Sequence, residues 1–522
     1  MSRLKRFTHS LFSGYVLLAA NMLYTFGSLR LVQHYVPNLA EFELWALTTA
    51  WVGYIALVDL GLSGAMSRIL IDYKDEEKGS NYGSVVQTAC LVGLVQGAII
   101  LVASLALFFA AGHLAKVNAE LVGDFRWLVA GQAALMAASF MTRIFNNLLW
   151  AHQRMDITNY TQSVLFPVSF AVLWLSLRAG CGLFSMIWAQ LAAWAIGAIV
   201  QVICCARLNL FPKTGRWGHP TWTRFHEVFA FGKDLFLFAL GSQMINASQP
   251  ILVNRCLDVV GAAAVWMVCT RTYFVVCQLV WKFFEAACTP LSEMLVREET
   301  ELCIQRFRGV TILTASSAVL TSILFVACNQ TFVQLWMGEK YCWSAWNDLL
   351  LGIWAVVMAI QRCHVGLLGA KKQLQVVKYI YFLEGTLFIC LALLFTRQGG
   401  FPALIGSSIL STLTCSFFYG SYTTMKDFRV SLRELVCDWM GPARRLAAFM
   451  VPLAWIVWMA ASRLPPIAAL AVMAVVIGGV GTVLFFRIGL DLSLQKEFAR
   501  KMPRKIAEIL GLAQNDAGAN GK

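Results

Sequence analysis

Apolar runs long enough to cross a bilayer recur along the whole chain and constrain its fold more than any other feature. About 20 apolar residues span a hydrocarbon core roughly 30 Å thick, where a single segment must be helical to satisfy its backbone groups. We therefore predict an all-α membrane protein. The runs indicate about fourteen transmembrane helices, near residues 10–32, 43–67, 83–112, 122–147, 156–177, 181–205, 234–255, 262–288, 309–330, 346–369, 376–396, 401–423, 446–462 and 466–487.

The composition excludes a soluble protein of this size. Of the 522 residues, 59% are hydrophobic and only 13% are charged, too few to cover a soluble surface. The first apolar run has no A-x-A-like cleavage site and is followed by another span, so we expect no cleaved signal peptide.

The net charge of +14 follows membrane topology rather than a nucleic-acid partner. With about fourteen spans and both termini in the cytoplasm, Lys and Arg concentrate in the cytoplasmic segments, as the positive-inside rule expects. The external loops hold only Lys116, Arg178, Arg255, Lys340, Arg397 and Arg463. We therefore expect no nucleic-acid partner.

The sequence carries no pattern typical of a cofactor, metal or catalytic site. Its 15 cysteines contain no C-x-x-C pair, and most lie inside apolar runs, where they act as small hydrophobic residues. No nucleotide-binding motif is present, and the longest external loop, at about residues 329–345, leaves little room for catalytic groups. We expect a protein that is not an enzyme and binds no cofactor.

An internal repeat divides the chain into two halves. The stretch RIFNNLLWAHQRMDITNY, residues 143–160, resembles RCHVGLLGAKKQLQVVKY, residues 362–379, without gaps, and Arg143 matches Arg362. Both copies hold the end of an even-numbered span, a short basic loop and the start of the next span, which predicts two pseudo-symmetric six-helix lobes. The predicted parts are an N-terminal lobe at 1–205, an interfacial cytoplasmic linker at 206–233, a C-terminal lobe at 234–424, a further helix pair at 425–490 and a basic cytoplasmic tail at 491–522.

Three predicted spans carry one polar stripe each, on a single helical face. A charge that faces lipid at the bilayer centre costs about 2.5–3.5 kcal/mol, so these stripes should face protein or a water-filled cavity. The predicted cationic cavity residues are Arg271, Lys282, Arg143, Arg30, Arg68 and Arg362. The predicted polar lining is Gln243, Asn246, Asn254, Gln278, Gln132 and Asn146, and the possible ion-coupling acids are Asp59, Glu285 and Glu384.

Two structural alternatives remain open for these charges. Lys282 and Glu285 are spaced to pair within one helix and hold helices together, and Arg30 and Arg68 are near enough to the membrane faces to reach lipid head groups. Arg271 has no acidic residue one turn away. An excess of cationic groups suits an anionic cargo, and the arginine fork suits phosphate.

The stretch RLVQHYVPNLAEFELWALTTAWVGYIALVDLGLSGAMSRIL, residues 30–70, resembles the polysaccharide-export branch of the multidrug/oligosaccharidyl-lipid/polysaccharide (MOP) superfamily, the Wzx-type flippases. The matching positions are Arg30, Pro37, Phe42, the run Asp59-Leu60-Gly61-Leu62 and the pair Ser67-Arg68. Glu43 stands where that family usually has glycine. Residues 251–266 show a looser likeness to the start of the family's second half.

This resemblance implies two six-helix lobes around a central cavity, alternating access and a location in the bacterial inner membrane. The implied cargo is a polyprenyl-pyrophosphate-linked oligosaccharide, moved from the cytoplasmic to the periplasmic leaflet for O-antigen, lipopolysaccharide or exopolysaccharide biosynthesis. The implied partners are that lipid-linked glycan, membrane lipids, and the glycosyltransferases and polymerase of the same pathway. A small-molecule/cation antiporter of the same superfamily and a membrane glycan polymerase or ligase remain alternatives.

Overall fold

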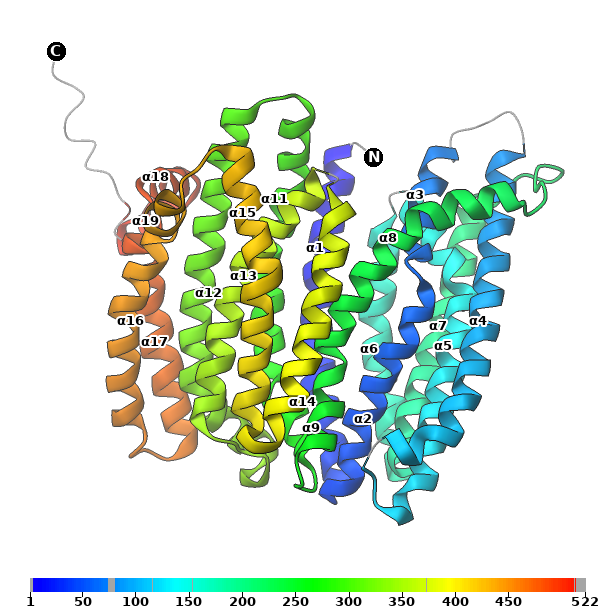
Figure 1. The fold of residues 1–522 in the computed structure, drawn as a ribbon, viewed down its shortest axis with the longest axis horizontal. Helices are drawn as coiled ribbons and strands as arrows, with labels where there is room; N and C mark the ends of the chain where they lie inside the picture. The colour runs from blue at the N-terminus through cyan, green and yellow to red at the C-terminus, as the bar shows by residue number, and fades with distance from the viewer. Residues whose placement is uncertain are drawn as a thin grey trace. The chain divides into compact units, whose positions relative to one another are not determined.

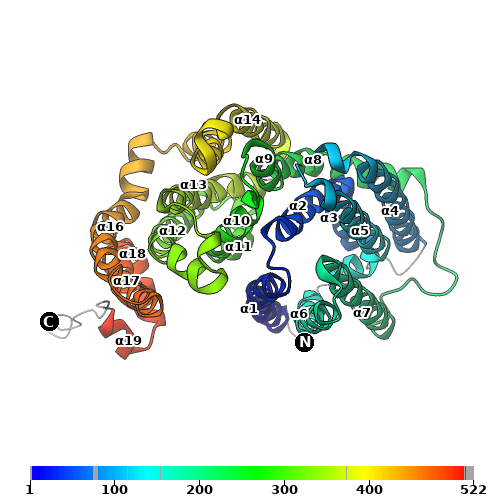
Figure 2. The ribbon, with the colours of Figure 1, turned by 90° about the horizontal axis from the view of Figure 1, so that it is seen from below.

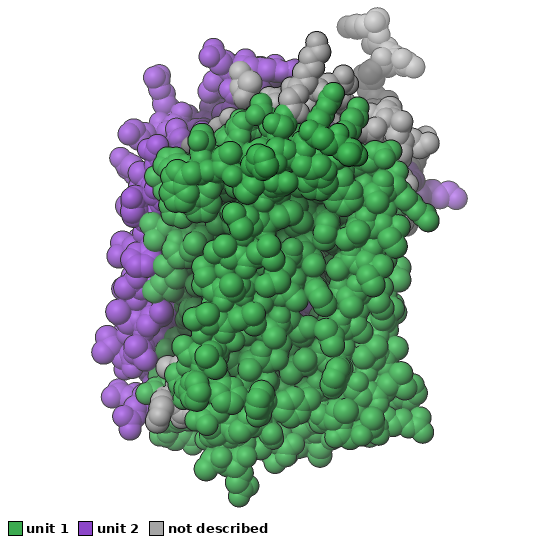
Figure 3. All heavy atoms as spheres, turned by 90° about the vertical axis from the view of Figure 1, so that its right-hand side faces the viewer, with its two compact units in different colours: residues 1–264 green, residues 265–522 purple. Residues whose placement is uncertain are grey.

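The computed structural model describes residues 3–73, 80–114, 116–152, 154–371, 373–510 and 512, and all regular structure within them is helical (Figure 1). The chain forms two compact units, residues 1–264 and 265–522, which Figure 3 colours separately. We call them unit 1 and unit 2. The lobe boundaries predicted from the sequence stay a prediction.

The helices of unit 1 are α1 (Arg3–Tyr35), α2 (Leu39–Ile55), η1 (Ala56–Asp59), α3 (Leu62–Tyr73), α4 (Asn81–Leu114), η2 (Ala119–Leu121), α5 (Val122–Ala151), α6 (Met155–Arg178), η3 (Gly182–Phe184), α7 (Ser185–Arg207), α8 (Trp222–Asn246), α9 (Ser248–Cys256) and the start of α10 (Ala262–Cys269). Those of unit 2 are α11 (Arg271–Val296), α12 (Thr300–Met337), η4 (Glu339–Tyr341), α13 (Ala345–Ala370), α14 (Leu374–Thr412), η5 (Leu413–Phe417), α15 (Phe418–Phe428), η6 (Glu434–Trp439), α16 (Gly441–Ala461), α17 (Pro466–Ile488), α18 (Leu492–Lys501) and α19 (Arg504–Ile509).

Eleven helical stretches of the described chain are long and apolar enough to cross a membrane. One of them, Gln375–Phe428, contains the two predicted spans 376–396 and 401–423. Gly400, with a φ of 63°, interrupts the helix between these two spans. The predicted spans 10–32 and 43–67 lie in α1 and in the segment from α2 to α3. The all-α membrane fold is confirmed, whereas the count of fourteen stays a prediction.

Two predicted spans are broken helices. The span 43–67 changes direction after η1, where Leu60 and Gly61 have φ values of 50° and 71°. The span 234–255 breaks at Ala247, between α8 and α9. Pro250 explains the second break, because a proline cannot donate to the carbonyl four residues earlier and its ring clashes there.

Close packing of α4 on α5 organises unit 1, and small residues allow it (Figure 2). A Cβ atom at Gly93 would lie 2.8 Å from the carbonyl oxygen of Phe140, and one at Gly97 would lie 2.7 Å from Cε of Met141. The four-residue spacing of the two glycines places them on one helical face, the pattern that lets membrane helices approach closely. Arg143 therefore lies on a helix whose position is fixed by backbone contact.

The helix α12 is central to unit 2 and packs against α11, α13, α16 and α17. Buried Met450, Met473 and Ile477 join α16 and α17 to the α12 side chain Ala315. Figure 2 shows α16 and α17 side by side next to α12. The predicted additional helix pair therefore packs as part of unit 2.

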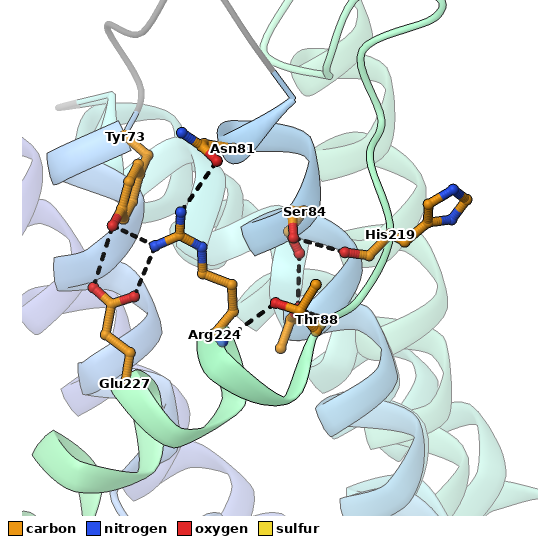
Figure 4. A network of polar contacts seen from close by, with 8 residues as sticks. Tyr73, Asn81, Ser84, Thr88, His219, Arg224 and Glu227 are labelled. Carbon is orange, nitrogen blue, oxygen red and sulfur yellow. Dashed lines mark hydrogen bonds and ion pairs between the residues drawn. The ribbon is translucent and has the colours of Figure 1, made fainter.

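The connection between α7 and α8, residues 208–221, is tied to α3 and α4 by the polar network of Figure 4. Arg224 at the start of α8 donates to Asn81 at 3.1 Å, to Glu227 at 3.0 Å and to the hydroxyl of Tyr73. Ser84 donates to the carbonyl oxygen of His219 at 2.6 Å. These bonds fix where α8 begins, and the interfacial location of this linker stays a prediction.

Candidate transport site

The intramembrane charge of unit 1 is an ion pair between Arg143 on α5 and Asp59 at the end of η1. The Nη1 atom of Arg143 lies 2.6 Å from Oδ1 of Asp59 and also donates to the hydroxyl of Ser63. Ser63 donates to the same carboxylate oxygen at 2.5 Å, and the guanidinium lies 3.9 Å from the ring centroid of Phe140. The side chains of Arg143 and Asp59 are 31% and 24% exposed, so the pair is partly shielded from solvent.

The break in the second predicted span brings Asp59 to this position. A turn inside a membrane leaves backbone carbonyls without helical partners, and each needs a donor. The Nε2 atom of Gln96 on α4 supplies both donations, at 3.1 Å to the carbonyl of Val58 and at 2.9 Å to that of Asp59. The Asp-Leu-Gly-Leu run therefore begins at a helix break whose carbonyls at Val58 and Asp59 have a hydrogen-bond donor, and this break places the Asp59 carboxylate against α5.

The other predicted cations of unit 1 lie elsewhere. Arg30 is exposed near the end of α1 and donates to Gln33 at 3.0 Å. Arg68 belongs to α3, and its side chain lies outside the described part of the structure. Neither residue is joined to the Arg143 pair by a described contact.

Some of the amide side chains predicted to line a cavity in unit 1 are buried or half-buried, and others are exposed. Gln132 is buried on α5, where its Nε2 atom has no described acceptor, and Asn146 accepts a hydrogen bond from α6 at 3.0 Å. Gln243 is half-buried on α8. Asn246 is exposed and donates to the carbonyl of Ser242 at 2.9 Å within its own helix. A shared lining role for these side chains stays a prediction.

Asn254 on α9 and Glu43 on α2 bind two loops of unit 1. Asn254 accepts from the backbone N–H of Lys116 at 2.9 Å and donates to its carbonyl at 3.0 Å. The buried carboxylate of Glu43 accepts from the backbone N–H groups of Gly261 at 3.0 Å and Ala263 at 2.9 Å, at the start of α10. The sequence marked Glu43 only as a departure from a family pattern, and the structure gives it a helix-capping role.

A second charged cluster lies in unit 2, on α11 and α13. The carboxylate of Glu285 is shared by Lys282 at 2.7 Å and Arg362 at 3.0 Å. The guanidinium of Arg362 also lies 4.7 Å from the ring centroid of Trp281. The side chains of Lys282, Glu285 and Arg362 are 45%, 40% and 42% exposed. The predicted pairing of Lys282 with Glu285 is confirmed, and Arg362 adds a second base.

A close helix approach makes this sharing possible. Gly366 lies one turn beyond Arg362, and a Cβ atom there would be 2.1 Å from the ring of Phe284. A side chain larger than hydrogen would require the Phe284 ring or the helix α13 to move, so the glycine favours the close approach that brings Arg362 to Glu285.

Arg271, the first residue of α11, stands apart from this cluster. It is half-buried, and its Nε atom is buried without an acceptor. Within the residues that the structure describes, Arg271 has neither a hydrogen-bond partner nor an ion pair. Gln278, predicted on the same stripe, is exposed. Arg271 is therefore a charge that the described chain leaves uncompensated.

Two buried carboxylates complete the picture in unit 2. Glu384 on α14 is 2% exposed; one oxygen accepts from Thr412 at 2.8 Å, and the other has no described donor. Asp348, which the sequence analysis missed, is buried on α13 and accepts from Asn329 at 2.7 Å and Trp343 at 2.8 Å. Asp348 lies in the first turn of α13, where a carboxylate is stabilised by the helix dipole, and this position was the signal that could have pointed to it. The described residues contain no cluster suited to a metal ion.

No family model and no curated protein sequence matches the chain. Solved structures do match. The lipid II flippase MurJ in an inward closed conformation is 11% identical with a TM-score of 0.66, over 91% of this chain and 99% of that one. An inward-facing multidrug resistance MATE transporter of the MOP superfamily is 12% identical with a TM-score of 0.62, over 80% and 99%. A MOP-superfamily transporter from Pyrococcus furiosus is 11% identical with a TM-score of 0.58, over 82% and 97%. The chain therefore has the fold of the MOP-superfamily transporters.

Proposed function

We propose that this chain is a transporter that moves a polyprenyl-pyrophosphate-linked oligosaccharide from the cytoplasmic to the periplasmic leaflet. The observation that carries the proposal is the uncompensated Arg271 on α11, the helix that also carries Lys282 and Glu285 of a cluster with one more base than acid. Alternating access would expose this face to each side of the membrane in turn. The pathway served is surface polysaccharide biosynthesis.

The charge balance of unit 2 suits an anionic cargo. Arg271, Lys282 and Arg362 are three bases, and Glu285 is the acid among them, which leaves two positive charges (3 − 1). A pyrophosphate loses hydration when it enters a membrane cavity, and fixed cations offset that loss. The fork of an unpaired arginine offers two parallel donors to a phosphate.

The positions of the acids argue against cation exchange as the main activity. Asp59 and Glu285 already accept from Arg143, Lys282 and Arg362, so a proton or cargo cation must displace these partners. The likeness to a lipid II flippase further supports a lipid-linked cargo.

One observation favours the rival antiporter. Glu384 is buried, and one of its oxygens has no described donor, as expected of a carboxyl group that binds and releases a proton. If the protein exchanges a drug-like cation for protons, Glu384 is a candidate to couple them, as is Asp348, whose Oδ2 atom is also buried without a described donor.

Complementation of a strain that lacks its lipid-linked-glycan flippase tests the proposal. Arg271→Ala should abolish surface glycan export at matched protein level, and Arg271→Lys should restore only part, because a point charge replaces a fork. Arg397→Ala, at an exposed arginine of the same unit, is the matched control and should export normally. Full export by Arg271→Ala together with loss of transport in Glu384→Gln would replace the flippase by the antiporter.

A further inference from the structure

A basic pocket lies in unit 2 at the start of α16, and its lining contains none of Arg271, Lys282, Glu285 and Arg362. Its volume is about 590 Å³, and its lining includes Arg308, Arg444, Arg445, Asp438 and Asp491. We infer that this pocket binds the phosphate of an anionic phospholipid head group. The inference does not rest on the proposed cargo.

Three elements of unit 2 build the pocket. Arg308 comes from α12, Arg444 and Arg445 come from the start of α16, and Asp491 precedes α18. Buried Trp439 at the end of η6 and Leu446 on α16 hold the segment against the core. Figure 1 shows the start of α16 and α18 at the same end of unit 2.

The arginines have donors to spare. None of the three forms an ion pair with a described residue, and Nε of Arg308 is buried without an acceptor. Arg444 donates to the carbonyl of Cys437 at 3.3 Å, which leaves its other donors free for a ligand. The start of α16 adds the positive end of a helix dipole, which favours an anion.

The acidic residues do not cancel this charge. Oδ1 of Asp491 accepts from the backbone N–H of Leu494 at 3.0 Å and from the hydroxyl of Ser493 at 2.9 Å, so it caps α18. Asp438 is exposed at the rim. The pocket lining has three bases and two acids, which leaves one positive charge (3 − 2). Asp491 is one of these acids, and its Oδ1 atom is engaged in capping α18.

A lipid fits this site better than free phosphate because exposed apolar side chains follow the arginines along α16. Arg445, Phe449, Pro452 and Ile456 recur at helical spacing and are all exposed, which forms a stripe with a charged end and an apolar length. A phospholipid has the same order of phosphate and acyl chain. The positive-inside rule predicts that this end faces the cytoplasm, where anionic head groups attract basic pockets between membrane helices.

The experiment uses the full chain in mild detergent, titrated separately with phosphatidylglycerol, phosphatidylcholine and inorganic phosphate. Thermal stability and the number of lipids retained in native mass spectrometry are measured. We expect phosphatidylglycerol alone to raise the melting temperature and to be retained. The double variant Arg444→Gln/Arg445→Gln should bind phosphatidylglycerol about 30-fold more weakly. Each basic residue near an anionic membrane surface contributes about fivefold to the affinity, and the two factors multiply.

Arg433→Gln, an exposed arginine of the preceding segment that does not line the pocket, is the matched control and should respond like the wild type. Arg308→Gln gives a second variant if the double variant does not fold, and should bind about fivefold more weakly. An undiminished phosphatidylglycerol response in these variants would overturn the site. An equal response to phosphatidylcholine or to inorganic phosphate would overturn the assignment of an anionic lipid.

Discussion

The two units each pair a repeat-related arginine with a carboxylate from an earlier span, yet they differ in the charge that remains. Arg143 in unit 1 and Arg362 in unit 2 are 219 residues apart (362 − 143) and occupy matching positions of the internal repeat. Each guanidinium also lies over an aromatic ring, at 3.9 Å for Phe140 and 4.7 Å for Trp281. The arginine, its acid and its ring are thus common to both halves.

The difference lies in the balance. In unit 1 one base meets one acid, and Ser63 holds both. In unit 2 the acid Glu285 has two bases, and Arg271 has no described partner at all. We therefore expect the shared pair to serve the fold in both halves, and we expect the surplus charge of unit 2 to be what a cargo uses. Three variants can break or sharpen this distinction.

The largest effect on stability should come from Asp59→Asn in unit 1. It leaves Arg143 partly buried with no carboxylate, which should cost about 2 kcal/mol of unfolding free energy, less than the 3–5 kcal/mol of a fully buried pair. The double variant Asp59→Asn/Arg143→Gln should recover most of that loss, because it also removes the stranded charge. Unfolding in detergent micelles titrated with a denaturing detergent measures both.

The single and double variants also show whether a loss of transport comes from lost stability. A transport defect in Asp59→Asn that disappears in the double variant is structural, whereas one that persists at restored stability gives the Asp59–Arg143 pair a direct role in transport. If the double variant is as unstable as the single one, the pair does not stabilise unit 1 and the comparison fails.

A smaller effect is expected from Arg362→Gln in unit 2. Glu285 keeps Lys282 at 2.7 Å, and all three side chains are substantially exposed, so the loss should stay below about 1 kcal/mol. Arg143→Gln, which strands Asp59, is the matched variant and should cost more. Equal losses for the two arginines, measured by the same unfolding assay, would show that the second base of unit 2 makes no difference.

Features that depend on local pattern were predictable from the sequence. Apolar run length gave the all-α membrane fold, and the three-residue spacing of Lys282 and Glu285 gave their ion pair. Pro250 is a local sequence signal for the helix break that the structure places at Ala247. Each of these follows from a few neighbouring residues.

Features that depend on which helices face each other were not predictable. Asp59 and Arg143 were both singled out, but a helical wheel gives a face and not the helix opposite it. The same holds for Glu285 and Arg362, which meet where Gly366 leaves room for the Phe284 ring. Asp348 escaped notice because its partner Asn329 lies on another helix, α12, although its second partner, Trp343, precedes it by only five residues.

The smallest effect on stability should come from Arg271→Gln, although this variant is expected to lose transport. A half-buried charge without a partner contributes no ion pair to the folded state, and its removal relieves a desolvation cost, so the unfolding free energy should stay within about 0.5 kcal/mol of the wild type or rise. Gln278→Ala, at an exposed residue of the same predicted stripe, is the matched control for the loss of a polar side chain. The same detergent unfolding assay should therefore rank Asp59→Asn well below Arg362→Gln, and Arg362→Gln below Arg271→Gln. A loss above about 1 kcal/mol for Arg271→Gln would mean that Arg271 has a stabilising partner in the folded protein, and the surplus charge that distinguishes unit 2 would no longer be free for a cargo.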